Sequence, residues 1–239
     1  MLMYGTTMFL IAATGRLVRH AALWSTAGVD AGSNCLSGGM ATSGALTTWF
    51  AELAGEPSVD RLFERAPSVP AGSRGLLTLP YFAGEPTPIA DPNARGVIAG
   101  LTLGHDRYDV FRSLVEATAL GVRHNLEAFA ESGAPISRVI AVGGGTAGGL
   151  WPQIVSDVTG CEQIVPLITV GASYGDARMA AESIGAVRDG EASWMKIDTI
   201  VHPNPAVRPI YDDLYARYRA LYVATADIVH SLGRTEVTQ

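Results

Sequence analysis

The sequence has few cysteines and no apolar run long enough to cross a membrane. It contains two cysteines in 239 residues, Cys35 and Cys161, too few and too far apart for a disulfide framework or a zinc site. We expect both to be small buried residues. The apolar run 8–13 is far too short to span a bilayer, and no basic segment of the kind that opens a signal peptide accompanies it. These absences make a cytoplasmic protein the default expectation.

Basic residues are also scarce. Seventeen Lys and Arg stand against 23 Asp and Glu, which gives a net charge of -6. Without a basic stripe to replace phosphate counterions, nucleic acid is excluded as a partner. Internal repeats and low-complexity tracts are absent as well. What remains is an ordinary globular composition, 48% hydrophobic, in a chain long enough for one large domain or two small ones.

Glycine, by contrast, is placed informatively. The β-branched segment 139–142 stops at Gly143, Gly144 and Gly145, and a helix is expected to begin near Leu150. Glycine permits positive φ and close approach of another molecule, and a helix start presents free N–H groups and a positive dipole end. This combination is typical of a nucleotide-binding loop. It is also typical of a plain tight turn between a strand and a helix.

The chain opens on a second glycine turn. The apolar segments 1–4 and 8–12 flank Gly5, Thr6 and Thr7, a pattern that predicts a β-hairpin. Because no leader residues precede the first strand, we expect a fragment whose upstream half is missing. The alternative is an ordinary start with a short first strand.

The remaining pattern predicts strands first and then helices alternating with strands. We expect further strands at 16–25, 76–79, 96–101, 139–142 and 163–165. We expect helices at 36–53, 59–66, 106–132, 150–159, 172–184 and 211–232. The segment 139–165 therefore reads as a β-α-β unit. This order fits an α/β domain of the actin-like, ribonuclease-H-like type, with a mixed sheet flanked by helices.

Several of these helices carry specific expectations. Ser58 and Asp106 are N-cap candidates. Arg112 and Glu116 stand four apart, on what the pattern suggests is the polar side of their helix. Small residues in 172–184 predict close packing against a neighbour, and the tyrosines of 211–232 predict a packing face. The helix 36–53 is expected to carry one apolar face made of Leu46, Trp49, Phe50 and Leu53.

At this point the residues resemble a known family. The motifs 80–88 (PYFAGEPTP), 91–96 (DPNARG) and 100–105 (GLTLGH) are similar to the C-terminal domain of the FGGY carbohydrate kinases, nearest to the xylulokinase-like pentulose kinases. The segments 116–127, 143–154 and 171–177 continue the resemblance, which runs from Gly5 to about Tyr222. Several motifs in the family's order make the match specific.

The resemblance implies that residues 1–239 are the nucleotide-binding domain of a kinase that transfers the γ-phosphoryl group of ATP to a sugar hydroxyl, with Mg²⁺. It implies nucleotide contacts at seven positions: Gly5, Thr6, Thr7, Gly44, Gly144, Gly145 and Gly148. The hairpin turn would contact the β- and γ-phosphates, Gly44 would lie near the phosphates and ribose, and the last three would hold adenosine. Relatives often carry Ser or Asn at the position of Gly148, so only backbone contact is expected there.

Catalytic residues are the main omission. Phosphoryl transfer needs a carboxylate that orients and deprotonates the acceptor hydroxyl. In this family that aspartate, most sugar contacts and the metal-associated acids belong to the N-terminal domain, so we assign no catalytic residue and no metal ligand here. The expected partners are ATP or ADP, a sugar substrate in the full-length enzyme and the missing N-terminal domain. Apolar surface left open by that domain would also permit a homodimer.

Two other classes stay open. One is a stand-alone actin-like nucleotide-binding or regulatory domain without kinase activity. The other is an unrelated α/β enzyme that uses the glycine loop for a different phosphate ligand, such as a dinucleotide. Against the dinucleotide, the glycine spacing is irregular, and Thr169 stands where an acidic residue would close the next strand.

In the proline-rich loop, Pro86 replaces an arginine common in relatives, and Glu85, Asp91 and Arg95 are expected to hold the loop.

Overall fold

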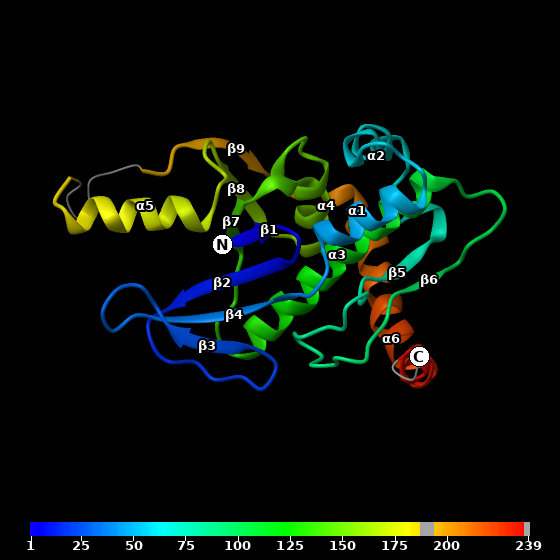
Figure 1. The fold of residues 1–239 in the computed structure, drawn as a ribbon, viewed down its shortest axis with the longest axis horizontal. Coiled ribbons are helices and arrows are strands. Elements are labelled where there is room, and N and C mark those ends of the chain that lie inside the picture. Colours follow the sequence, from blue (N-terminus) through cyan, green and yellow to red (C-terminus); the bar gives the residue numbers. More distant parts are fainter. Residues whose placement is uncertain (187–193, 237–239) are drawn as a thin grey trace.

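A computed structural model describes residues 1–186 and 194–236 of the chain (Figure 1). Its strands are β1 Leu2–Tyr4, β2 Met8–Thr14, β3 Trp24–Ala27, β4 Asn34–Met40, β5 Leu77–Leu79, β6 Val97–Ala99, β7 Arg138–Val142, β8 Glu162–Pro166 and β9 Ile197–Val201. Its helices are α1 Gly44–Leu53, α2 Val59–Arg65, α3 Arg107–Glu131, α4 Leu150–Thr159, α5 Ala172–Ser183 and α6 Arg208–Glu236. Short 3₁₀ turns lie at Ala66–Ser68, Ser73–Gly75, Gly144–Thr146 and Pro205–Val207.

Seven strands form one mixed sheet in the order β3-β4-β2-β1-β7-β8-β9, and β5 pairs with β6 separately. β1 and β2 make the predicted antiparallel hairpin, in which Tyr4 lies opposite Met8. β7 and β8 are parallel and joined by α4, as the β-α-β prediction requires. β1 also runs parallel to β7, and this central pair links the hairpin half of the sheet to the β-α-β half.

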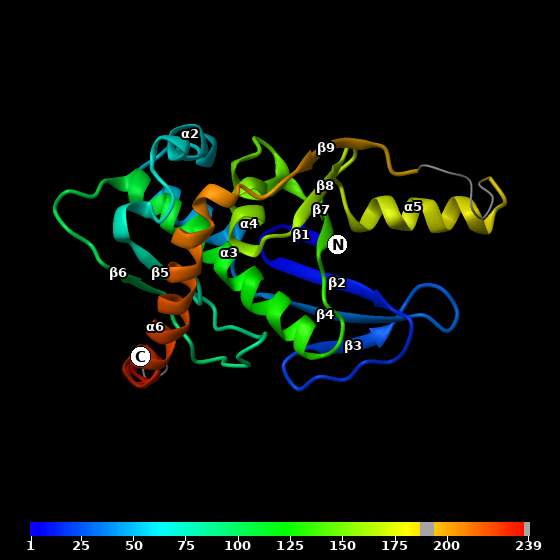
Figure 2. The same ribbon diagram turned by 180° about the vertical axis from the view of Figure 1, so that it is seen from behind.

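The long helix α3 is the centre of the core. It packs against α4 and β4 and also contacts α1 and β5 (Figures 1 and 2). Its residues Phe111, Leu114 and Val115 are fully buried. Asp106 caps it as predicted, since its carboxylate accepts the N–H groups of Tyr108 and Asp109. Capping fixes where this helix starts, and the buried stripe fixes how it faces the sheet.

Most predicted elements are confirmed, but the segment 16–53 is confirmed only in part, since of the helix predicted at 36–53 residues 44–53 form α1. The third strand, expected at 16–25, lies at Trp24–Ala27, and residues 34–40 form β4 instead of the start of a helix. A Cβ on Gly39 would lie 2.4 Å from the Met8 carbonyl oxygen. Glycine therefore lets β4 pair closely with β2, and this long-range pairing overrides the local helical pattern.

The predicted apolar face of the helix that begins at Gly44 is also wrong in part. Leu46 and Phe50 are buried, whereas Trp49 is 39% and Leu53 is 67% exposed. Once residues 34–40 are a strand, α1 is three turns long and lies at the surface. Its outer side therefore faces solvent, and the ring of Trp49 packs on Phe82 with ring centroids 4.8 Å apart.

Arg112 and Glu116 pair as predicted, but not on a polar surface. The Arg112 Nε donates to Glu116 at 2.9 Å, and the two side chains are 9% and 1% exposed. The Glu116 carboxylate also accepts hydrogen bonds from the Gly72 N–H, the Ser73 hydroxyl and the Tyr211 hydroxyl. The pair therefore joins α3 to the loop before β5 and to α6 inside the molecule.

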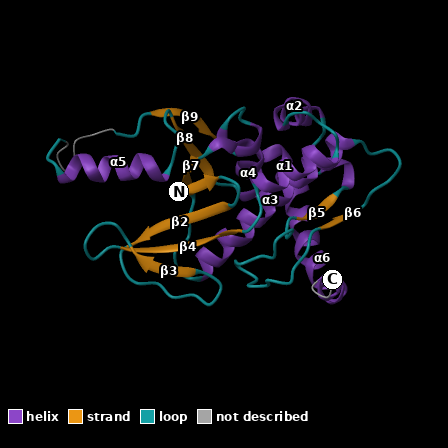
Figure 3. Ribbon diagram, in the orientation of Figure 1, coloured by secondary structure: helices purple, strands orange, loops and turns teal. Residues whose placement is uncertain are grey.

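The two remaining helices differ in how they pack. The tyrosine face of α6 is confirmed: Tyr211 and Tyr218 are buried, and Tyr81 donates to the Tyr218 hydroxyl oxygen at 2.6 Å. By contrast, α5 has no buried residue and projects from the body of the molecule in both views (Figures 1 and 2). The close packing predicted for its small residues has no counterpart among the described residues. Figure 3 shows the strands and helices of the same view in separate colours.

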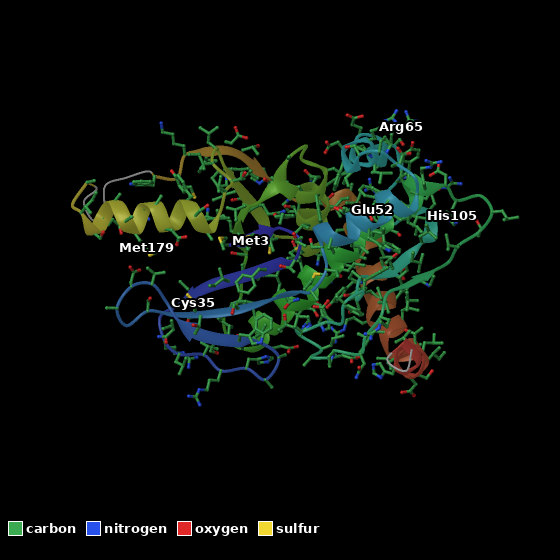
Figure 4. The ribbon with its side chains drawn as sticks, in the orientation of Figure 1. Met3, Cys35, Glu52, Arg65, His105 and Met179 are labelled. Atoms are coloured by element: carbon green, nitrogen blue, oxygen red, sulfur yellow. The ribbon has the colours of Figure 1, made fainter. Side chains whose placement is uncertain are left out.

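The two cysteines are free thiols. Cys161 is buried as expected, whereas Cys35, on β4, is partly exposed. His105 is held by hydrogen bonds to the Thr102 N–H and to the Arg74 carbonyl oxygen, which makes it a structural residue before α3 (Figure 4).

Candidate functional site

The candidate site lies where the two central strands end. β1 and β7 are parallel, with Leu2 beside Ala141, so their carboxyl ends reach the same edge of the sheet. β1 ends at Tyr4 and leads into the turn Gly5–Thr7, and β7 ends at Val142 and leads into the glycine loop. In open α/β sheets, ligands bind in the crevice at such carboxyl ends. The two glycine motifs, far apart in sequence, therefore meet.

The first motif is a tight turn bound to the start of α1. The Gly5 N–H donates to the Thr7 carbonyl oxygen at 3.1 Å. The N–H of Gly44 donates to the Gly5 carbonyl oxygen at 2.9 Å, and that of Ala45 to the Thr6 carbonyl oxygen at 3.1 Å. A Cβ on Gly44 would lie 2.7 Å from the Gly5 carbonyl oxygen, so only glycine lets helix and turn approach this closely.

This docking decides which donors remain for a ligand. The first N–H groups of α1 are used by carbonyl oxygens of the turn and are not free. The Thr6 hydroxyl, in contrast, makes no hydrogen bond to any residue that the structure describes, and Thr6 lines the adjoining hollow. The turn therefore presents a hydroxyl donor to the hollow, at a position set by α1.

The second motif packs its outer glycines and leaves the middle one open. Gly143 has φ +98°, and a Cβ there would lie 2.4 Å from the Tyr4 carbonyl oxygen. A Cβ on Gly145 would lie 2.9 Å from the Tyr4 Cβ, whereas at Gly144 no atom lies within 4 Å of that position. Gly148, with φ +75°, is also open. The loop thus touches β1 on one side and offers bare backbone on the other.

A group of aromatic rings packs beside the glycine loop. Trp151, in the first turn of α4, donates its indole N–H to the Thr118 hydroxyl oxygen at 2.9 Å. The Trp151 ring stacks on Phe63 of α2 at 5.7 Å between centroids and meets Tyr4 edge-on at 5.8 Å. Burial raises the pKa of Tyr4 well above its usual range, so this ring stays neutral. These contacts give the site a rigid apolar floor.

Two adjoining hollows share this floor. The larger, of about 670 Å³, is lined by Tyr4, Gly5, Thr6, Gly44, Ala45, Thr47, Thr48, Trp49, Glu52, Val59, Asp60, Phe63, Gly144, Gly145 and Trp151. The smaller, of about 360 Å³, is lined by Asp60, Phe63, Glu64, Pro67, Gly144, Gly145, Ala147, Gly148 and Leu150. Asp60, Phe63, Gly144 and Gly145 belong to both, so the hollows form one elongated groove.

The rim of the groove is acidic. Glu52 on α1, labelled in Figure 4, and Asp60 and Glu64 on α2 are exposed carboxylates. Neither lining includes a lysine or arginine. Among the described residues that line the groove, hydroxyl and backbone N–H groups, and not cationic side chains, would therefore hold a polyanionic ligand. Among the described residues no cluster of three His, Cys, Asp or Glu side chains could hold a metal ion.

Six of the seven sequence-predicted positions line the groove. Five belong to the larger hollow and Gly148 to the smaller one. Thr7 is exposed and lines neither hollow; its carbonyl oxygen closes the turn. Sequence reasoning missed Asp60 and Phe63. Their only local signal was a capped amphipathic helix, and the Ser58 hydroxyl does accept the Asp60 N–H at 3.1 Å.

A family model decides what this architecture belongs to. Residues 1–184 match the model for the C-terminal domain of the FGGY family of carbohydrate kinases. The chain belongs to the FGGY family. The xylulose kinase of Bacillus subtilis is 27% identical over 184 residues, covering 75% of this chain and 37% of that enzyme. The glycerol kinase of Saccharopolyspora erythraea is 32% identical over 208 residues, covering 81% of this chain and 41% of that enzyme.

Solved FGGY structures show the same fold. The xylulose kinase from Rhodospirillum rubrum superposes with a TM-score of 0.84 at 31% identity, covering 96% of this chain and 47% of that one. The α/β actin-like fold class expected from the sequence is thereby confirmed, as is the family resemblance. This FGGY chain spans less than half the length of the relatives it matches. No helix in the described parts of the chain is long and apolar enough to cross a membrane.

Proposed function

We propose that this chain is the ATP-binding half of an FGGY kinase that transfers the γ-phosphoryl group of ATP to a hydroxyl of a sugar. One observation carries the proposal: the Gly5–Thr6 turn and the Gly144–Gly145 loop line one groove. Thr6 and Gly144 are 138 positions apart in the sequence. Open glycine backbone beside a hydroxyl donor suits a phosphate chain joined to a nucleoside. Relatives named xylulose kinase and glycerol kinase support a kinase reaction on a carbohydrate or polyol hydroxyl.

The nucleotide would lie along the groove in one direction. Its phosphates would meet Gly5, Thr6 and Gly44, and its adenosine would follow Gly144, Gly145 and Gly148. The Thr6 hydroxyl and turn N–H groups would donate to phosphate oxygens, and the aromatic floor would exclude water beneath the nucleoside. Since no catalytic base is assigned to this chain, its part in the reaction is to position the γ-phosphoryl group for attack.

The other half of such a kinase would supply the sugar site, the base and the acids associated with Mg²⁺. The apolar side chains left open beside α5 suit contact with that half. They include Leu167, Val170 and Ile184, which are 63%, 67% and 80% exposed. A pentulose such as xylulose is our proposed acceptor because xylulose kinases are prominent among the relatives and the structural matches.

Turnover measurements test this division of labour. We expect no ADP release by these 239 residues with ATP, Mg²⁺ and xylulose, ribulose or glycerol, because general base catalysis alone supplies about 10²- to 10⁴-fold. The product of the complete gene should show pentulose-dependent ADP release in a coupled assay. Sugar-dependent turnover by the isolated chain would contradict the proposed role as one half of an enzyme. A complete gene that encodes no actin-like upstream domain would favour a stand-alone binding domain.

Thr6→Val tests the phosphate turn in the complete enzyme. Valine keeps the shape of threonine and deletes the hydroxyl donor, so we expect turnover to fall about 10-fold or more, the effect of losing one charge-assisted hydrogen bond of ~1.5–3 kcal/mol. Thr7→Val is the matched comparison, because Thr7 lines neither hollow, and its loss should be smaller. Equal turnover in the wild type and Thr6→Val would remove Thr6 from the site.

A further inference from the structure

Asp60 occupies a distinctive place in the groove. It lies in the first turn of α2 and is the only carboxylate that lines both hollows in the described structure. The Ser58 hydroxyl lies 3.3 Å from the Asp60 Oδ2 and can donate to it. No other hydrogen bond or ion pair to this carboxylate occurs among the described residues. Asp60 is therefore oriented from one side and keeps acceptor capacity for a ligand.

The order of residues along the groove shows which part of a nucleotide reaches Asp60. Gly5, Thr6 and Gly44 line only the larger hollow, where phosphates are proposed to lie. Glu64, Pro67, Ala147, Gly148 and Leu150 line only the smaller hollow, at the opposite end. In a nucleotide the ribose stands between the phosphates and the base. The junction of the two hollows, which holds Asp60 and Phe63, is therefore the ribose position.

The chemistry at this junction matches a sugar diol. A carboxylate only accepts hydrogen bonds, and a ribose presents two adjacent hydroxyl donors, at 2′ and 3′. Such charge-assisted bonds are stronger than neutral ones. Phosphate would be repelled by Asp60, and the Phe63 ring provides apolar surface rather than a polar partner. Neutral hydroxyl groups are thus the part of a nucleotide that this position suits.

We infer that Asp60 recognises the ribose hydroxyls and makes this FGGY domain discriminate ribonucleotides from deoxyribonucleotides. Ser58 acts as a positioning residue that holds the carboxylate toward the groove. The inference rests on the proposed nucleotide-binding function and adds to it a residue that sets specificity. It involves no residue of the turn or of the glycine loop.

Calorimetric titration of the full 239-residue chain with ATP, 2′-deoxy-ATP and 3′-deoxy-ATP tests the inference. We expect the wild type to bind ATP about 3- to 10-fold more tightly than at least one deoxy analogue, a modest ratio because Asp60 is exposed to solvent. Asp60→Ala should bring the ratio close to 1 by weakening ATP alone. Asp60→Asn keeps an oxygen acceptor and should retain part of the discrimination.

Glu56→Gln is the matched control. Glu56 stands four positions before Asp60, lines neither hollow and is paired with Arg107 at 2.7 Å. The Glu56→Gln substitution removes a negative charge near Asp60 and should leave the ratio of ATP to deoxy-ATP affinity at its wild-type value. Equal affinity of the wild type for ATP and both analogues would overturn the inference while leaving nucleotide binding intact. So would loss of discrimination in Glu64→Gln but not in Asp60→Ala. Absence of any ATP binding would instead overturn the proposed function, and this inference with it.

Discussion

Gly144→Val should abolish nucleotide binding without disturbing the fold. The wild-type chain is expected to bind ATP or ADP with a Kd of about 10 µM to 1 mM, because it supplies one side of the cleft. No atom lies within 4 Å of a Cβ built on Gly144, and its φ is outside the left-handed region, so valine fits the free protein. Its methyl groups would occupy the groove, and we expect affinity to fall more than about 100-fold.

Calorimetry and circular dichroism together check this result. Gly15→Val is the matched control, since a Cβ there also meets no atom within 4 Å and Gly15 lines neither hollow of the groove. Both variants should keep the helical spectrum, and only Gly144→Val should lose the ligand. If Gly144→Val bound ADP as tightly as the wild type, adenosine could not lie at the glycine loop.

Glu85→Gln should make the stability of the chain less dependent on pH. Glu85 is 2% exposed, and neither carboxylate oxygen has a hydrogen-bond partner of good geometry among the described residues. Burial raises the pKa of Glu85 well above its usual range, and the Thr87 N–H offsets this only in part. The titratable side chains that face it, Tyr81 and Tyr218, are themselves buried and supply no positive charge.

The sign of the effect follows from linkage. A carboxyl whose pKa is raised by folding stabilises the native state fully below its unfolded pKa and loses that contribution as pH rises toward the folded value. Between the unfolded pKa of Glu85, ~4.5, and its higher folded pKa, the wild type should lose about 1.4 kcal/mol of unfolding free energy per pH unit, whereas Glu85→Gln should not. In urea unfolding, the free energy of unfolding of Glu85→Gln relative to that of the wild type should therefore rise from pH 5 to pH 7.

Glu131→Gln, at the exposed end of α3, makes the same chemical change in water and serves as the comparison. Its unfolding free energy should follow that of the wild type across the pH range. A constant difference between Glu85→Gln and the wild type at every pH would show that the Glu85 carboxylate is not destabilised by burial.

Asp91 and Arg95 were predicted, with Glu85, to hold the proline-rich loop. The contacts of these two residues are consistent with that role: Asp91 accepts a hydrogen bond from Tyr222 at 2.8 Å, and Arg95 donates to the Ala94 carbonyl oxygen at 2.9 Å.

Where sequence patterns predicted the fold correctly, the signal was local. The capped helices α2 and α3, the hairpin of β1 and β2 and the β-α-β unit are each encoded within a short window of residues. Caps satisfy the N–H groups of one turn, and glycine turns set φ at single positions, so neighbouring residues are enough to specify them. The two glycine motifs are recognisable from the sequence for the same reason, because each lies within a few consecutive residues.

Tertiary structure decided the rest. Strand β4 exists because seven residues pair with β2, and Gly39 is required there because a Cβ would lie 2.4 Å from the Met8 carbonyl oxygen. Whether Arg112 and Glu116 face water or the core depends on α6 and on the loop before β5, not on their spacing of four. The sequence alone predicted the two glycine motifs that we propose contact a nucleotide. Only the parallel pairing of β1 with β7 brought them to one edge, and only the packing of α2 added Asp60 and Phe63, because such contacts depend on residues distant in the chain.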